Sequence, residues 1–471
     1  MKIGLFGIGL DAYWPQFAGL KERLENYLHI AEQKLAAIHP SVFNAGLVDN
    51  TDKAFETGRM FKQQDVDIIF LYVTTYALSS TVLPFVQRLK VPVIVLNLSP
   101  AAAIDYTAFN NMDDSTKMTG EWLAYCSACA VPEIANVFNR TGIPFHQITG
   151  MLHNDKECWN EVKEWVEAAK VAHVMAYNRL GCIGHYYSGM LDIYTDLTLH
   201  YAHFGGHIEL LEVEELAALR KAVTGSQIKE RVQLINDVFD VQPGCSLEEL
   251  EKAAVTSVAL DNLVEQYQLG SIAYYYKGTG NADNEEAISS IILGNSLLTA
   301  RGIPVAGEYE IKNAQAMKIM DSFGVGGSFT EYYAMDFTDD VILMGHDGPG
   351  HIAIAEGKTK VRPLKVYHGK VGKGLSVEMM VKNGPVTLLS VVERKDKGLM
   401  LLVAEGESVA GAILQIGNTN SRYKFSIGAR KFMNEWNSYG PAHHCAVGVG
   451  HIAGKIHKLG KLLNMEIIKV C

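Results

Sequence analysis

The chain changes character within residues 307–351, which read GEYEIKNAQAMKIMDSFGVGGSFTEYYAMDFTDDVILMGHDGPGH. The first part of this stretch, residues 309–323, reads as a helix, and a glycine-rich connection at 324–328 follows it. Residues 329–337 then alternate with a period of two, and the apolar VILMGH at 341–346 has the composition of a strand. The stretch therefore predicts where an α/β part of the chain ends and a β part begins.

Upstream of this stretch, apolar strands alternate with amphipathic helices. Strands are predicted at residues 2–9, 42–48, 66–73, 91–98 and 144–152, and helices at 17–38, 51–62, 82–89, 131–142 and 156–178. Continuous apolar strands separated by helices are typical of a parallel sheet that is covered on both faces. We therefore predict a doubly wound, flavodoxin- or Rossmann-like domain. The glycines at 4, 7 and 9 do not complete the dinucleotide-binding fingerprint, which favours a tight first turn.

A second α/β unit is predicted from residue 179 onward. The segment RLGCIGHYYSGM at 179–190 reads as a strand that opens into a loop. Ligands of open α/β sheets bind beyond the carboxyl ends of the strands. The loop side chains, His185, Tyr186, Tyr187, Met190 and Asp192, are therefore candidates for substrate contact, and aromatic packing at a domain junction is the alternative. Charged helices over 210–269, a strand at 271–276 and a helix at 287–300 complete the unit.

Short alternating strands follow Asp340. They read VILMGH, HIAIAEG, RPLKVYHG (362–369), LSVEMMVKNG, VTLLSVVERKDKG, LMLLVAEGES and GAILQIG, and a helix and a closing strand end the chain. Many short strands with such spacing predict an antiparallel sheet or barrel. The predicted fold class is thus α/β, with two doubly wound parallel-sheet domains followed by a C-terminal antiparallel β-barrel. The predicted domains are 1–174 (N-terminal α/β), 175–327 (central α/β) and 328–471 (β domain with a terminal helix).

Composition excludes several classes of protein. A formal net charge of −10 without a cluster of lysines and arginines argues against a nucleic-acid partner. No apolar run approaches the length that crosses a bilayer. The first residues, MKIGLFGIGLDAYW, lack a small-residue cleavage pattern and fit a first strand better than a secretory signal. We therefore predict a cytoplasmic protein without a membrane partner.

The seven cysteines are scattered and odd in number, unlike a disulfide framework. Cys126-Ser-Ala-Cys129 has the spacing of a redox or metal motif. It lies, however, within WLAYCSACAVPEIANVF at 122–138, which reads as a packed helix. Buried thiols behave as small hydrophobic groups, so this context favours a role in the core.

Two glutamates in the opening stretch stand out from an ordinary charged surface. Glu308 follows a buried apolar segment, and Glu331 is flanked by Phe329, Tyr332 and Tyr333. A carboxylate in apolar surroundings is costly unless it is paired or ligated. A helix N-terminal carboxylate that complements the dipole is the alternative for Glu308 alone. Together with histidines, the two carboxylates would form an oxygen and nitrogen ligand set that suits a divalent ion such as Mn²⁺.

Several histidines compete for such a site. His346 lies in a glycine-rich turn and His444 lies just before the terminal helix, which makes both plausible ligands. His351 lies five residues beyond His346 and could replace it. His443 could instead orient a neighbour or hydrogen-bond a substrate, and His451 fits a helix surface better. Single histidines are usually structural, so only their pairing with the two glutamates raises His346 and His444 above that background.

Four segments together resemble the L-arabinose isomerase family, which is related to the L-fucose isomerases. They are GEYEIK with Glu308, SFTEYYAMDF with Glu331, MGHDGPGH with His346 and PAHHCAVGVGH with His444. The resemblance implies that these four residues bind a catalytic Mn²⁺, and it implies the same order of domains. It also implies a homo-oligomer, a trimer or hexamer with sites at subunit boundaries. The family's sugar-reading motifs are replaced here by GLDAYWPQ and NNMDDSTKMTGEW, so the substrate is not carried over.

The expected activity is that of a metal-dependent aldose–ketose isomerase that acts on a pentose or related sugar through an enediolate. Two carboxylates in different environments suit the proton transfers of such a reaction. The expected catalytic residues are Glu308 and Glu331, the expected metal ligands are Glu308, Glu331, His346 and His444, and the expected substrate-binding residues are His185, Tyr187, Met190 and His443. An epimerase acting on a sugar or polyol and a non-catalytic sugar-binding protein are the alternatives.

Overall fold

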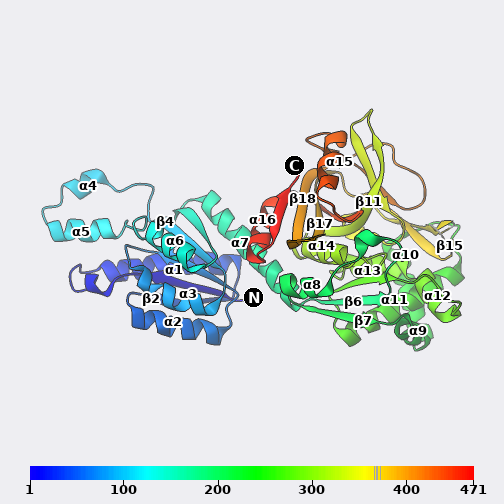
Figure 1. Ribbon diagram of the computed structural model, residues 1–471, viewed down its shortest axis with the longest axis horizontal. Helices are drawn as coiled ribbons and strands as arrows, with labels where there is room; N and C mark the ends of the chain where they lie inside the picture. The colour runs from blue at the N-terminus through cyan, green and yellow to red at the C-terminus, as the bar shows by residue number, and fades with distance from the viewer. Residues whose placement is uncertain (365, 368–369, 372) are drawn as a thin grey trace. The chain divides into compact units, whose positions relative to one another are not determined.

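The computed structural model describes residues 1–364, 366–367, 370–371 and 373–471. The chain divides into two compact units, Met1–His173 and Val174–Cys471 (Figure 1). The strand expected at 362–369 includes residues 365, 368 and 369, which lie outside the described residues. The domain boundaries expected at 174/175 and 327/328 stay predictions.

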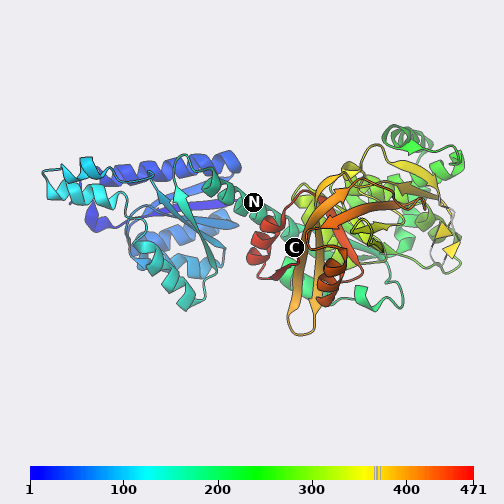
Figure 2. The same cartoon turned by 90° about the horizontal axis from the view of Figure 1, so that it is seen from above.

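The first unit is a five-stranded parallel sheet in the order β2-β1-β3-β4-β5. Its strands are β1 (Ile3–Ile8), β2 (Val42–Val48), β3 (Ile68–Val73), β4 (Val93–Ser99) and β5 (Phe145–Met151). Its helices are α1 (Leu20–Ile38), α2 (Thr51–Gln64), α3 (Leu83–Leu89), α4 (Tyr106–Asn110), α5 (Ser115–Leu123) and α6 (Ala130–Thr141), and α7 (Lys156–Tyr177) begins in this unit and ends in the second. Helices cover both faces of the sheet (Figure 2). The predicted doubly wound architecture is confirmed, and the strand order is the flavodoxin-like one.

The continuous helix expected at 122–138 is wrong. α5 ends at Leu123, residues 124–129 form a turn, and α6 begins at Ala130. Pro132 explains the break, because proline has no backbone N–H and fits the first turn of a helix but not its interior. Cys126 is buried in this turn, whereas Cys129 is exposed, so Cys129 does not pack in the core.

The second unit begins with a four-stranded parallel sheet in the order β10-β9-β6-β7. Its strands are β6 (Arg179–Gly184), β7 (His207–Leu211), β9 (Ser271–Tyr275) and β10 (Val305–Ala306). The helices of this part are α8 (Leu197–Phe204), α9 (Val213–Lys221), α10 (Gly225–Val238), α11 (Leu247–Tyr267), α12 (Ala282–Ser289), α13 (Ile292–Ala300) and α14 (Ile311–Ser322). The single helix expected at 287–300 is two helices, since the hydroxyl of Ser290 bonds to the carbonyl oxygen of Glu286 where α12 ends.

A closed antiparallel barrel of six strands follows, in the order β17-β20-β11-β12-β19-β18, and pairing of β17 with β18 closes it. The strands are β11 (Gly326–Asp336), β12 (Val341–His346), β17 (Gly384–Arg394), β18 (Gly398–Val409), β19 (Thr419–Phe425) and β20 (His444–Val449). The closing strand β21 (Glu466–Lys469) runs parallel to β18, and α15 (Ala429–Ser438) and α16 (Ala453–Leu462) are the last helices. Two small sheets contain β8 (Asp240–Val241), β13 (Lys360–Pro363), β14 (Val366–Tyr367), β15 (Lys370–Val371) and β16 (Leu375–Glu378). The predicted C-terminal barrel is confirmed.

None of the helices in the described ranges combines the length and the apolar composition needed to cross a membrane.

Trp436 of α15 is fully buried in the barrel core, where its ring stacks on Phe432 with centroids 5.6 Å apart. A Trp436→Ala variant is expected to lower the free energy of unfolding by about 3–5 kcal/mol, because it leaves a cavity that the core cannot fill. Urea denaturation measures this change. Trp122→Ala, on the 45% exposed Trp122 of α5, is the control. A loss no larger for Trp436→Ala than for this control would contradict the buried role of Trp436.

Candidate metal centre

Strand register brings three of the expected ligands together. β11 lies between β12 and β20, so Glu331 is paired with Gly345 on one side and with His444 on the other. His346 is the last residue of β12, directly after Gly345. A side chain at Gly345 would meet the carbonyl oxygen of Thr419 at 1.8 Å, so only glycine fits there. The carboxylate of Glu331 and the imidazoles of His346 and His444 therefore lie close together on three neighbouring strands of the barrel.

Glu308 reaches the same place from the turn between β10 and α14. Glu308 and Tyr309 both have left-handed backbones, with φ of 56° and 63°. Each such residue costs roughly 1–3 kcal/mol and persists only where the surrounding structure holds it. The backbone N–H of Tyr309 donates to the carbonyl oxygen of Tyr274 at 2.9 Å, which ties the turn to the end of β9. Glu310, not Glu308, occupies the position before the first residue of α14.

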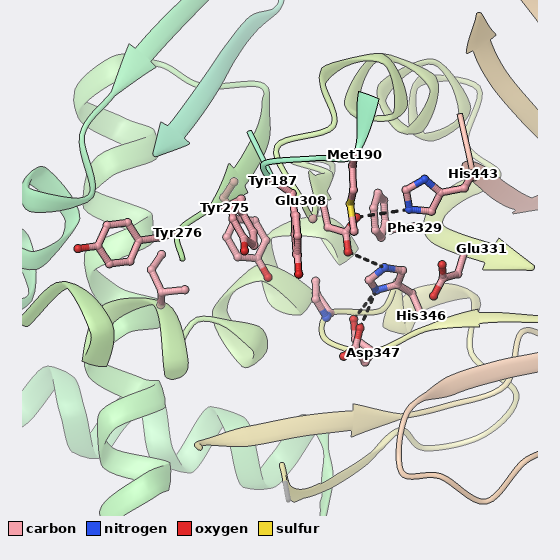
Figure 3. A pocket seen from close by; sticks show the side chains of 14 residues that line it. Tyr187, Met190, Tyr275, Tyr276, Glu308, Phe329, Glu331, His346, Asp347 and His443 are labelled. Carbon is pink, nitrogen blue, oxygen red and sulfur yellow. Dashed lines mark hydrogen bonds and ion pairs between the residues drawn. The ribbon is translucent and has the colours of Figure 1, made fainter. Parts of the chain in front are cut away.

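The four expected ligands and His443 form two overlapping groups, and Figure 3 shows Glu308, Glu331, His346 and His443 of these groups. Glu308, His443 and His444 each offer one ligand atom within 4.8 Å of the others, and so do Glu331, His346 and His444. His444 belongs to both groups. The Oε2 atom of Glu308 lies 3.4 Å from the Nε2 atom of His443 and 3.5 Å from that of His444. Its Oε1 atom lies 4.0 Å from the Nε2 atom of His346.

His444 is held in place by a buried carboxylate. Its Nδ1 atom lies 2.5 Å from the Oε2 atom of Glu310, and both side chains are buried. Its other nitrogen, Nε2, is buried without a hydrogen-bond partner and lies 3.5 Å from the Oε2 atom of Glu308. Buried polar atoms are nearly always satisfied, so an unpartnered imidazole nitrogen beside a carboxylate suits a bound cation. The residues present thus fit a divalent metal ion, with the carboxylate–histidine support that is typical of such sites.

Burial shifts the pKa values of three ionisable groups at the site. Burial raises the pKa of Glu310 to about 8, against the opposing effect of nearby Lys312. Burial and the neighbouring imidazoles of His346 and His443 hold the pKa of His444 well below its usual value. Burial also raises the pKa of Glu331, while His346 and His443 counteract it. Burial thus disfavours the charged form of each group, whereas a bound cation would favour the anionic carboxylates.

His346 is oriented by the residue that follows it. Its Nδ1 atom lies 2.5 Å from the carbonyl oxygen of Asp347 and 3.2 Å from the Oδ1 atom of the same residue. A donor at Nδ1 leaves the lone pair of Nε2 pointing toward the carboxylates. The ring of Phe329 contacts both His346 and His444, with centroids 4.6 Å and 4.3 Å away. The ring of Phe329 therefore packs against both imidazoles and forms an apolar side of the site.

His443 bridges two carboxylates. Asp192 Oδ2 accepts from the backbone N–H of His443 at 3.0 Å and lies 2.6 Å from its Nδ1 atom. Burial alone would lower the pKa of His443, but hydrogen bonds to Glu308 and Asp192 outweigh burial and raise the pKa to about 9. At neutral pH His443 is thus a cation and a donor. This charge state suits hydrogen bonding to an oxygen ligand better than coordination of a metal.

A pocket of about 120 Å³ opens beside the two groups. Its lining includes the expected Glu308, Glu331, His346 and His443, together with Tyr187 and Met190 of the expected substrate-binding set (Figure 3). His185 is not part of this lining. Its ring is exposed and packs on Tyr275 and Tyr276, with centroids 5.4 Å and 6.1 Å away.

The other histidines lie elsewhere. His351 is buried 3.9 Å from Asp321, and neither candidate group includes it. The Nε2 atom of His451 lies 3.0 Å from the carbonyl oxygen of Gly406, just before α16 begins. Among the described residues, His346 rather than His351 is therefore placed at the candidate centre.

Sequence reasoning missed three features of the site. They are Glu310 behind His444, Asp347 behind His346 and the run Tyr274–Tyr276, which lines the pocket from the end of β9. Glu310 had a readable signal, because it lies two residues beyond Glu308 in the same turn. The tyrosine run also had a signal, since it marks a strand end in an α/β sheet.

Comparison with known proteins gives one match of sequence. Residues 326–466 match the family described as L-arabinose isomerase C-terminal domain. No curated protein matches the chain. Similar solved structures include a carbohydrate transporter from Acidothermus cellulolyticus 11B in complex with myo-inositol, 12% identical over 68% of this chain and 87% of that chain, with a TM-score of 0.16. A likeness at this score supports no conclusion about fold or function.

Proposed function

We propose that this protein is a metal-dependent aldose–ketose isomerase. The premise is that residues 326–466 form an L-arabinose isomerase-like domain. The match suggests a sugar isomerase, and a pentose or related sugar is the proposed substrate. The observation that carries the proposal is the meeting of Glu308 and Glu331 with three imidazoles beside a pocket. A protein that only binds sugar has little need for such a set.

The proposed ligands of a divalent ion, with Mn²⁺ preferred, are Glu308, Glu331, His346 and His444. Such an ion, when bound, would polarise the two adjacent sugar oxygens and stabilise the charge that develops on them. Isomerisation also needs groups that take a proton from one carbon and return it to the next. Glu308 and Glu331 face the pocket from different elements, the turn before α14 and strand β11, as two carboxylates with two roles require.

The substrate side of the pocket is proposed to include His443, Tyr187 and Met190. His443 offers a charged donor to a sugar hydroxyl, and Asp192 holds its ring in place. The ring of Tyr187 lies against that of Tyr275, with centroids 4.6 Å apart, and presents an apolar wall. Aromatic walls with few placed polar groups are typical of small-molecule sites. The role expected for His185 stays a prediction.

Replacement of Asp192 by asparagine tests the orienting contact. Asp192→Asn is expected to raise KM for the sugar about tenfold with a smaller change in kcat, because a charge-assisted hydrogen bond to His443 is lost. Steady-state kinetics measures both constants. Asp240→Asn, at an exposed position of β8, is the control and should change neither. An unchanged KM for Asp192→Asn would argue against a substrate role of His443.

Metal removal tests the function itself. The chelated protein is expected to lose turnover of a panel of aldoses and ketoses, and added Mn²⁺ should restore it. His444→Ala should retain the fold but bind Mn²⁺ more weakly, as measured by titration calorimetry. Turnover that survives chelation would contradict the proposal. A product with an inverted carbon would identify an epimerase, and sugar binding without turnover would identify a binding protein.

The proposed assembly follows from the same family premise, and the proposed location is the one expected from the sequence. We propose a homo-oligomer, a trimer or hexamer, in the cytoplasm. Sedimentation velocity of the purified protein measures the assembly, and a monomer at micromolar concentration would contradict it.

A further inference from the structure

Two cysteine sulfurs face each other in the first unit, in the turn between α5 and α6. The thiol of Cys126 donates to the sulfur of Cys129, and the two Sγ atoms are 2.9 Å apart. A disulfide needs about 2.05 Å, so small rotations of the two side chains would bring the atoms to bonding distance. The pair thus has the sequence spacing and the sulfur–sulfur contact of a dithiol that can form a disulfide.

The two sulfurs differ in access. Cys126 is 4% exposed, and burial followed by its hydrogen bond with Cys129 raises its pKa to about 12. Cys129 is exposed and lies at the start of α6, a helix of twelve residues. An external reagent can therefore reach Cys129, while Cys126 is shielded behind it. One reachable sulfur and one shielded sulfur are the parts of an attacking and resolving pair.

The turn that carries the pair is tied to the strand ends of the sheet. The hydroxyl of Thr75, after β3, donates to the carbonyl oxygen of Leu123 at 2.8 Å. The hydroxyl of Ser127, between the two cysteines, donates to Asn97 of β4 at 3.0 Å. These anchors hold both sulfurs in place on either side of Ser127. Bond formation therefore requires no unfolding of the sheet.

The surroundings argue against the two other uses of such spacing. Among the described residues, neither sulfur belongs to a group of three metal-ligating side chains. A structural zinc site needs four ligands. A purely apolar role fits Cys126 but not the exposed Cys129. The remaining chemistry of two touching thiols is exchange with a disulfide.

We propose that Cys126 and Cys129 form a redox-active pair that is oxidised by small-molecule disulfides. The Cys129 thiolate attacks one sulfur of the external disulfide, which forms a mixed disulfide and releases one small thiol. Cys126 then loses its proton and attacks the Cys129 sulfur, which releases the second small thiol. Two protein thiols are oxidised to one disulfide, and one external disulfide is reduced to two thiols. This inference is independent of the isomerase proposal.

The test uses the full chain in mixtures of oxidised and reduced glutathione, trapped with an alkylating reagent. Intact mass and peptide mapping count the protected thiols among the seven cysteines. Toward the oxidising end, a Cys126–Cys129 cross-linked peptide is expected to dominate, and dithiothreitol should reverse it. Failure of this peptide to form while Cys129 becomes glutathionylated would overturn the proposal. This arm needs no variant, so it does not depend on how a substitution folds.

Variants test the division of roles. Cys126→Ser is expected to accumulate glutathione on Cys129 roughly tenfold more than wild type, because no second thiol resolves the adduct. Cys129→Ser is expected to leave Cys126 as a free thiol. Cys245→Ser, which removes a cysteine of the second unit, is the control and should form the cross-link as wild type does. Equal adduct levels in wild type and Cys126→Ser would refute a resolving role of Cys126.

Discussion

A Glu331→Gln variant is expected to isomerise sugar about 10³-fold more slowly than wild type. The amide keeps the size of the side chain, so the pairing of β11 with β12 and β20 should survive. It removes both a negatively charged ligand atom and a group that can exchange a proton with the substrate. Initial rates with saturating Mn²⁺ measure the loss, and saturation separates slow chemistry from weak metal binding.

Glu407→Gln provides the matched control for this experiment. Glu407 lies in the same barrel, on β18, but its side chain is exposed. The control should keep wild-type rates, and circular dichroism should be the same for all three proteins. A Glu331→Gln enzyme that retains most of its activity would remove Glu331 from the mechanism. Glu308→Gln makes the same test for the second carboxylate, from the turn before α14.

A Glu310→Leu variant is expected to bind Mn²⁺ about 10–100-fold more weakly than wild type. Glu310 would not touch the ion, but its carboxylate meets His444 Nδ1 and fixes which way the ring faces. Leucine leaves this buried nitrogen without a partner, so the imidazole loses both its orientation and its electron donation. Titration calorimetry measures the affinity.

Glu310→Gln separates charge from shape in the same experiment. The amide oxygen can still accept from His444, so part of the affinity should return. Glu212→Gln is a control for the loss of an acidic residue before a helix, because Glu212 occupies the corresponding position of α9. An unchanged affinity in Glu310→Leu would mean that His444 is not a ligand or does not depend on Glu310.

Local pattern predicted the elements well. The strand at Val42–Val48 was placed at its observed bounds, and the alternation of strands and helices gave the doubly wound sheet. Two failures occurred where a side chain acts on the backbone, as Pro132 does at the start of α6 and Ser290 does at the end of α12. The strands expected at 351–357 and 411–417 are also wrong, because a short 3-10 helix occupies 352–354 and residues 411–417 form a loop. Periodicity reports apolar faces and carries no signal for such local competition.

The candidate site was less accessible to sequence reasoning. Glu331, His346 and His444 were singled out by residue type and by resemblance, but their proximity depends on β11 lying between β12 and β20. Strand order in a barrel is set by contacts between distant segments, which no local pattern encodes. The position of Glu310 beside Glu308 is readable from the sequence, but its pairing with His444 is not, because the two residues are 134 positions apart. Tyr187 and Met190 line the pocket, whereas His185 of the same loop does not.

Because the barrel is closed by pairing of distant strands, the candidate centre is assembled only in the folded protein. Glu331, His346 and His444 are adjacent only while β11 stays hydrogen-bonded to both neighbours. An unfolded chain therefore lacks this arrangement of ligands, so a divalent ion that binds there would favour the native state. Occupancy at a hundredfold excess over Kd then adds about 2.7 kcal/mol to resistance against unfolding. The proposed metal site therefore predicts a melting temperature that rises with the free concentration of the divalent cation.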